Sequence, residues 1–113
     1  MAKYLIAIYR PSGVNPATLL DGEMLRQIDT LNDEMVAAGI RLFVGGLQPV
    51  QTAISIVPQL TEQMQISEEP YLKESDYVDG FWVLDVTGRE EAIAWGKKAA
   101  LACRAAVEVR PFH

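Results

Sequence analysis

Acidic side chains crowd one segment of the chain, between positions 68 and 79. They are Glu68, Glu69, Glu74, Asp76 and Asp79. Carboxylates that lie close together raise one another's pKa, and such a pair can transfer protons or hold a hard cation. The segment lacks the spacing of a calcium-binding loop, so the pattern favours a solvated acidic loop. Acid–base catalysis by two of these carboxylates stays open as an alternative.

Other groups that could act as nucleophiles or bases are few. Cys103 is the single cysteine and His113 the single histidine, so neither an internal disulfide framework nor a histidine-rich metal site is expected. Cys103 shares a predicted helix face with Trp95 and Ala99, which indicates buried packing, whereas His113 belongs to no pattern. No Gly-x-Ser-x-Gly elbow and no phosphate-binding glycine loop occurs. We therefore expect no catalytic centre, no metal and no cofactor.

Four polar side chains stand out as candidates for a binding cleft: Arg10, Gln48, Glu68 and Tyr71. Arg10 ends the first predicted strand and Gln48 follows the second, whereas Glu68 and Tyr71 belong to the predicted loop at 67–79. A small-ligand cleft is typical of a place where a long loop lies over the ends of central strands. Arg10 could bind a ligand carboxylate there, or form a structural ion pair with Glu68.

The composition indicates one folded domain over residues 1–113. Half of the 113 residues are hydrophobic, only 22% are charged and the mean hydropathy is +0.08, which argues against disorder. The net charge of −5 and the pI of about 4.8 offer no basic surface to a nucleic acid. No signal peptide or membrane span is recognisable, and a free thiol is typical of a reducing compartment. We therefore expect a cytoplasmic protein that binds neither nucleic acid nor membrane.

Two helices are predicted. The first begins at the cap Asn15-Pro16, and Gly39 ends it in the left-handed conformation. Its apolar stripe recurs every three or four residues and comprises Leu20, Met24, Ile28, Leu31, Met35 and Ala38. The second begins at a capping box of Thr87 and Glu90 and runs to about residue 103. Because this helix is rich in alanine, we expect it to lie close to the sheet.

Short apolar runs bounded by turn residues predict strands at 4–9, 40–47, 51–57, 62–66, 80–86 and 105–110. The order is β-α-β, an inserted β-hairpin with a long loop, and β-α-β, which predicts an α+β fold of the ferredoxin-like βαβ-βαβ type. The strands at 4–9 and 80–86 are apolar on both faces, but two helices cover only one face of such a sheet. The chain is therefore expected to form a homodimer that buries sheet against sheet.

Five short segments of the chain contain motifs that are similar, in the same order, to those of a known protein family. They read Lys-Tyr-Leu-Ile-Ala-Ile-Tyr-Arg-Pro at 3–11, Gly-Leu-Gln-Pro at 46–49, Ser-Glu-Glu-Pro-Tyr at 67–71, Asp-Gly-Phe-Trp-Val-Leu-Asp-Val at 79–86 and Ala-Val-Glu-Val-Arg-Pro at 106–111. In this order they resemble the YCII-related proteins, in particular the branch named after a DGPF motif. The resemblance implies a dimeric α/β barrel built from one domain per chain.

The chain departs from that family pattern in two places. Glu68-Glu69 stands where the family has Asp-Gly, which keeps a carboxylate but loses a glycine suited to a tight turn. No histidine follows the first strand, so the histidine–aspartate pair of a dechlorinating relative cannot be carried over. The resemblance therefore implies the fold more than any activity.

The sequence favours a homodimeric small-molecule-binding or accessory protein without a recognisable catalytic centre. Two alternatives stay open. One is a minor enzyme that uses carboxylate chemistry, or simple enclosure of its substrate, in the barrel cleft. The other is a regulator that contacts a protein partner, because some proteins of the family it resembles are encoded beside, or fused to, extracytoplasmic-function sigma factors.

Overall fold

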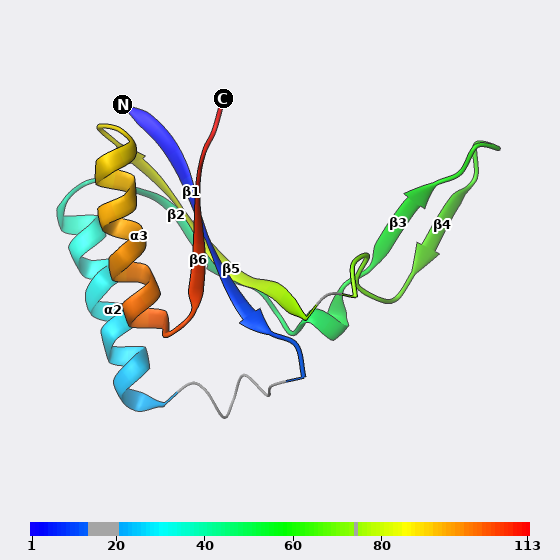
Figure 1. Cartoon of the computed structure of the whole chain (residues 1–113), viewed down its shortest axis with the longest axis horizontal. Helices are drawn as coiled ribbons and strands as arrows, with labels where there is room; N and C mark the ends of the chain where they lie inside the picture. The colour runs from blue at the N-terminus through cyan, green and yellow to red at the C-terminus, as the bar shows by residue number, and fades with distance from the viewer. Residues whose placement is uncertain (14–20, 74) are drawn as a thin grey trace.

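The computed structural model describes residues 1–13, 21–73 and 75–113, which form an α+β protein (Figure 1). In chain order the elements are β1 (Ala2–Pro11), α2 (Gly22–Ala37), β2 (Arg41–Gly46), the short 3-10 helix η1 (Val50–Thr52), β3 (Ser55–Pro58), β4 (Met64–Ser67), β5 (Asp76–Val86), α3 (Arg89–Cys103) and β6 (Ala106–Pro111). The predicted cap Asn15-Pro16, Leu20 of the predicted stripe and Glu74 of the acidic segment lie outside the described residues.

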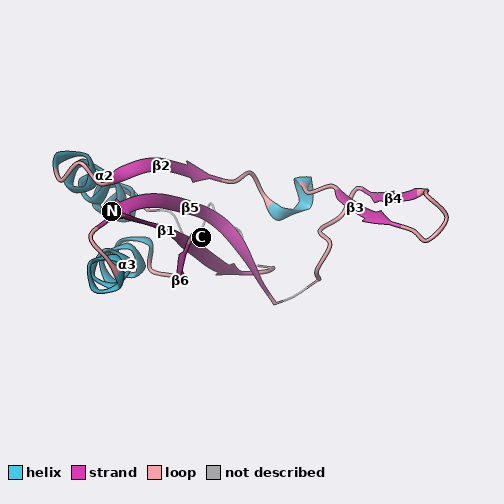
Figure 2. Cartoon of the chain, turned by 90° about the horizontal axis from the view of Figure 1, so that it is seen from above, coloured by secondary structure: helices cyan, strands magenta, loops and turns pink. Residues whose placement is uncertain are grey.

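A four-stranded antiparallel sheet in the order β2-β5-β1-β6 forms the body of the protein. β1 is central, because it pairs with β5 along one side and with β6 along the other. Both helices lie on the same face of this sheet (Figures 1 and 2). The α+β class is confirmed, and the arrangement is compatible with a ferredoxin-like fold. In the described part of the chain, no helix is long and apolar enough to cross a membrane.

Local interactions fix both ends of α2. The Asp21 carboxylate accepts a hydrogen bond from the backbone N–H of Met24 at 2.8 Å, which is an N-cap. Gly39 has a φ of 71°, so the predicted left-handed ending is confirmed. Ala38, the last member of the predicted stripe, is exposed. The stripe residues that are fully buried against the sheet are Met24, Leu31 and Met35.

The start of α3 differs from the predicted capping box. The helix is capped by Gly88, one residue later than predicted, so its third residue is Glu91 instead of Glu90. Thr87 accordingly donates both its backbone N–H and its hydroxyl to Glu91 Oε1, at 3.0 and 2.9 Å. The motif was recognised correctly as a helix start, but the partner named for Thr87 was wrong.

α3 packs very closely on the sheet. A Cβ atom added at Gly96 would lie 2.6 Å from Cγ2 of Val109 in β6, which is closer than real side chains approach. The predicted close approach of this helix is therefore confirmed. The buried residues of α3 are all small: Ala92, Gly96, Ala99, Ala102 and Cys103.

The central strands are longer than their apolar runs. β1 continues to Pro11, and β5 begins already at Asp76, because the polar start of β5 pairs with the end of β1. The predicted loop at 67–79 is therefore shorter than expected. The pairing of β2 with β5 is irregular between Arg41 and Phe43.

The two faces of the sheet are covered differently. The inner face, under the helices, holds the core, whose sheet residues are Tyr4, Ile6, Ile8, Trp82, Leu84 and Val86. Alternate positions of the same strands point to the other side. We call this other side the open sheet face, because none of the described helices covers it (Figure 2). Its apolar residues are Leu5, Ala7, Phe43, Phe81 and Val83.

Candidate functional site

Arg10 and Asp79 form an ion pair where β1 ends and β5 begins. Arg10 Nε donates to Asp79 Oδ2 at 2.9 Å, and the two side chains are only 5% and 24% exposed. A second guanidinium N–H, on Nη1, donates to the backbone carbonyl of Cys103 at 3.0 Å. Arg10 thus ties the centre of the sheet to the end of α3.

A bulge in β5 presents Asp79 to Arg10. Ile8 pairs with Gly80, whereas the next residue, Tyr9, pairs with Val78, so Asp79 has no residue opposite it in β1. Such an extra residue redirects its side chain. Its backbone carbonyl is also engaged, because it accepts a hydrogen bond from the N–H of Leu47 at 2.8 Å. Asp79 therefore joins the strand ends of β1, β2 and β5 at one point.

A cavity of about 290 Å³ opens beside this ion pair. Arg10 and Asp79 supply polar groups, and apolar side chains supply other parts of the wall. Those apolar residues include Ile28 of α2, Val44 of β2 and Trp82 of β5. Mostly apolar walls with a few fixed polar groups are typical of small-molecule sites, and the volume is near the lower end of their range.

Glycines let the backbone form part of this cavity's wall. A Cβ atom at Gly80 would lie 2.8 Å from the carbonyl oxygen of Gly45 and 3.2 Å from Cα of Gly46. All three residues line the cavity. Their lack of side chains allows β2 and β5 to approach closely and leaves space that larger residues would fill.

Cys103 lies at the same place but is not arranged as a nucleophile. It is buried, and this burial raises the pKa of its thiol, while the nearby Arg10 charge acts in the opposite direction. The thiol is therefore protonated at neutral pH. Its backbone carbonyl, which accepts from Arg10, is the group that contributes to the site. The prediction that Cys103 has a packing role is confirmed.

Only one of the four predicted cleft residues lines this cavity. Arg10 does, but its carboxylate partner is Asp79 and the predicted pairing with Glu68 is not formed. Gln48, Glu68 and Tyr71 are exposed and are not among the lining residues, although both neighbours of Gln48 are. Asp79 was predicted to lie in an acidic loop, so it was not recognised as the partner of Arg10.

The acidic segment is divided between several environments. Glu69 forms an exposed ion pair with Lys73 at 2.7 Å, which lowers the pKa of the Glu69 carboxyl and raises the pKa of Lys73. Asp76 lies in β5, and Asp79 faces Arg10. Among the residues the structure describes, no three His, Cys, Asp or Glu side chains lie close enough to hold a metal ion.

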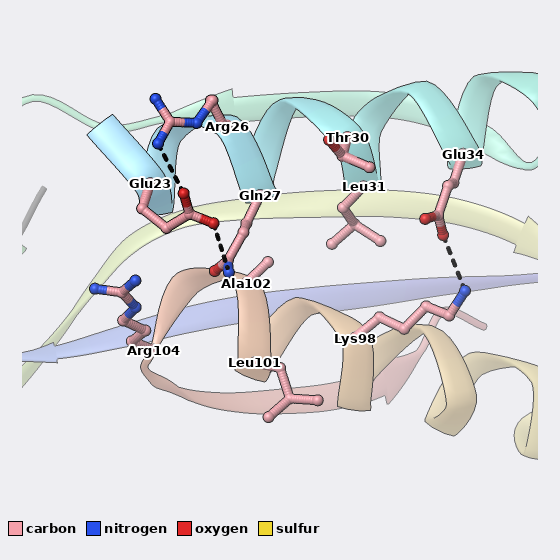
Figure 3. Close-up of a pocket in the computed structure, with 10 residues that line it drawn as sticks. All are labelled: Glu23, Arg26, Gln27, Thr30, Leu31, Glu34, Lys98, Leu101, Ala102 and Arg104. Atoms are coloured by element: carbon pink, nitrogen blue, oxygen red, sulfur yellow. Dashed lines mark hydrogen bonds and ion pairs between the residues drawn. The ribbon is translucent and has the colours of Figure 1, made fainter. Parts of the chain in front are cut away.

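A larger groove of about 760 Å³ runs between α2 and α3 (Figure 3). Leu31 and Ala102 contribute to its lining, and charged pairs lie along it, with Lys98 Nζ 2.9 Å from Glu34 Oε2 and Arg26 Nη2 2.7 Å from Glu23 Oε2. The charged side chains of these two pairs are 46–72% exposed. We regard it as a surface groove, and place the candidate site at the smaller cavity, which is lined by the partly buried Arg10–Asp79 pair.

Comparisons with known proteins leave the family open. No protein-family model matches the chain, and no curated protein matches it either. The resemblance to YCII-related proteins therefore stays a prediction that rests on the motifs quoted above. The candidate site must be interpreted from its own geometry.

Proposed function

We propose that this chain is a homodimeric small-molecule-binding protein, with a ferredoxin-like, YCII-related fold in which two chains form a dimeric α/β barrel and β3–β4 is the inserted hairpin. The observation that supports binding is the partly buried Arg10–Asp79 pair, in which Arg10 is only 5% exposed, beside a cavity of about 290 Å³. A charged pair is costly to remove from water, and here it lies at the wall of a space large enough for a ligand.

The lining supports a small ligand with an apolar body and one polar group. The apolar side chains of Ile28, Val44 and Trp82 would contact the body of the ligand. A guanidinium offers N–H donors and a carboxylate offers acceptors, so the pair can orient a ligand carboxylate, carbonyl or hydroxyl. Binding fits this site better than nucleophilic catalysis, because the one thiol nearby is buried with a raised pKa.

The open sheet face supports the homodimer. Phe43 and Phe81 stack there with their ring centroids 5.7 Å apart, and Phe43 is 55% exposed. Aromatic side chains on an uncovered sheet face are typical of the centre of an interface. A two-fold axis through this face would bury the same residues of both chains, as an isologous dimer requires.

A thermal-shift screen tests the binding function. The probes are small aromatic and aliphatic carboxylic acids, with the corresponding amides and alcohols as neutral analogues. A ligand at about 100 times its Kd adds about 2.7 kcal/mol to the free energy of unfolding, which raises the Tm by about 10 °C for a domain of this size. We expect at least one compound to cause a concentration-dependent shift.

The matched variants are Val44→Phe, which fills the cavity, and Val36→Phe, which makes the same change on an exposed position of α2. We expect Val44→Phe to remove the ligand-dependent shift and Val36→Phe to keep it. Circular dichroism shows whether each variant is folded. A screen without any shift, or a shift that a folded Val44→Phe variant retains, would overturn the proposed site.

A further inference from the structure

The β3–β4 hairpin projects away from the rest of the chain. β3 pairs only with β4, in a two-stranded sheet separate from the main one. Figures 1 and 2 both show the helices on one side of the main sheet and the hairpin extending beyond the other side, which is the side of the open sheet face. A second body seated on that face would therefore lie beside the hairpin.

One face of the hairpin is apolar and uncovered. Ile56 pairs with Ile66, and Pro58 with Met64, so these residues share a face. Ile56, Met64 and Ile66 are 61%, 59% and 66% exposed, and the preceding Ile54 is 65% exposed. We call the exposed surface formed by Ile56, Pro58, Met64 and Ile66 the hairpin face.

The opposite face of the same hairpin differs in character. It carries Ser55, Ser67, Val57 and Gln65. Ser55 is buried, and its hydroxyl donates to the backbone carbonyl of Glu69. That side is therefore tied to the loop after β4, whereas the hairpin face has no such cover. An isolated two-stranded hairpin is marginally stable in water, so this one requires a further contact.

The size and charge of the exposed surface indicate what provides that contact. The hairpin face exposes apolar surface on the order of 400 Å², about half of what each side of a stable interface buries. The open sheet face, which includes the exposed Phe43 on the edge strand β2, lies on the side toward which the hairpin extends, and a partner seated there would bury the remainder. Glu62 is the only charged residue from position 53 to 67, so an anionic partner such as a nucleic acid or an acidic peptide would find no positive charge to pair with.

We propose that the β3–β4 hairpin is an exchanged arm, which packs its hairpin face on a second copy of this chain, adjacent to the sheet-to-sheet contact. One partner copy then covers both exposed apolar surfaces of each chain, and the two-fold axis makes the exchange reciprocal. The proposal rests on the homodimer of the proposed function, but concerns a different surface. It explains why uncharged, apolar strands extend away from their own core.

The test compares dimer dissociation constants, measured by analytical ultracentrifugation over a concentration series of the full-length chain. Ile56→Thr/Ile66→Thr removes apolar surface from the hairpin face and keeps β-branched residues suited to a strand. Val57→Thr/Gln65→Thr is the matched control, because it changes one cross-strand pair of the same hairpin on the opposite face. Phe43→Ser probes the open sheet face separately.

We expect the Ile56→Thr/Ile66→Thr dimer to dissociate at least 10-fold more readily than the wild type, and the control to stay within about twofold. If the wild type is dimeric and both hairpin variants have its dissociation constant, the exchange of the arm is overturned while the homodimer is supported. If Phe43→Ser leaves the dimer intact and Ile56→Thr/Ile66→Thr dissociates it, the sheet-to-sheet contact is overturned and the exchange of the arm is supported. A wild type that stays monomeric overturns both.

A photo-crosslink gives a measurement that does not depend on a variant's stability. p-Benzoylphenylalanine at position 66 should produce a covalent species of twice the 12.5 kDa chain mass after irradiation. Mass spectrometry of that species should locate the adduct on the second copy. Adducts confined to the same chain would show that the hairpin folds back on its own body, and would overturn the exchange.

Discussion

Arg10 and Asp79 are 69 positions apart in the chain, yet they form its most buried ion pair in the described residues, with Nε and Oδ2 2.9 Å apart. The pair exists because Asp79 is the extra residue of a bulge in β5, directed at the end of β1. It is therefore both a structural link and a wall of the candidate cavity. The two roles can be separated by measuring stability in the absence of any ligand.

Asp79→Ala should destabilise the protein by about 3 kcal/mol, because it leaves the Arg10 guanidinium buried without its counter-charge. The double variant Arg10→Met/Asp79→Leu should lose less, since neither charge then remains. Urea denaturation of the three proteins measures the differences.

The control for that experiment is Glu69→Ala, which breaks the exposed ion pair with Lys73. Exposed pairs contribute little because water screens them, so we expect no measurable change in the midpoint. An Asp79→Ala variant as stable as Glu69→Ala would show that the Arg10–Asp79 pair does not hold the strand ends together.

Gly96→Ala should destabilise the protein even though alanine favours a helix by about 1 kcal/mol over glycine. The new Cβ would lie 2.6 Å from Cγ2 of Val109, and overpacking of this kind costs about 1–3 kcal/mol. We expect a net loss of about 1 kcal/mol, or a Tm lower by about 4 °C in a thermal melt.

Two further variants identify the cause of that loss. Val109→Ala in the Gly96→Ala background removes the clashing methyl group, so the second substitution should cost less there than in the wild type. Gly22→Ala, at the start of α2, places its Cβ 3.6 Å from the nearest atom and should be neutral or stabilising. Equal behaviour of the two alanine variants would contradict the close contact between α3 and β6.

Short-range sequence patterns predicted the buried face of α2, its end and the start of α3 well. The stripe that includes Met24 and Met35 predicted the buried face of α2, and Gly39 predicted its end. Both signals lie within the element they describe, because helix periodicity and a left-handed glycine depend on neighbouring residues. The helix start at residues 87–91 was recognised for the same reason.

The candidate site was harder to predict. Arg10 was identified, but its partner depends on which residue of β5 is left unpaired, and strand register is set by contacts far apart in sequence. Gln48, Glu68 and Tyr71 were placed in the cleft on the assumption that the loop folds over the strand ends. The path of a loop does not follow from its composition, and all three side chains are exposed.

Glu91 should make the stability of the fold depend on pH in the acidic range. Its carboxylate accepts hydrogen bonds from the backbone N–H and hydroxyl of Thr87, and from Trp95 Nε1 at 3.2 Å. These bonds, chiefly the one from the Thr87 backbone, lower the pKa of Glu91 in the folded state. The stabilisation is therefore present above the ordinary glutamate pKa and is lost as the pH falls through the lowered folded value.

Glu91→Gln should accordingly reduce stability by about 1 kcal/mol at pH 7, and the difference from wild type should shrink as the pH falls below the ordinary pKa of about 4.5. Thermal melts between pH 7 and pH 3 measure this. Glu90→Gln is the matched control, because it removes the same charge from the exposed neighbouring position and should leave the pH profile unchanged. If Glu90→Gln flattened the profile and Glu91→Gln did not, the original capping-box assignment of Thr87 with Glu90 would be correct in solution.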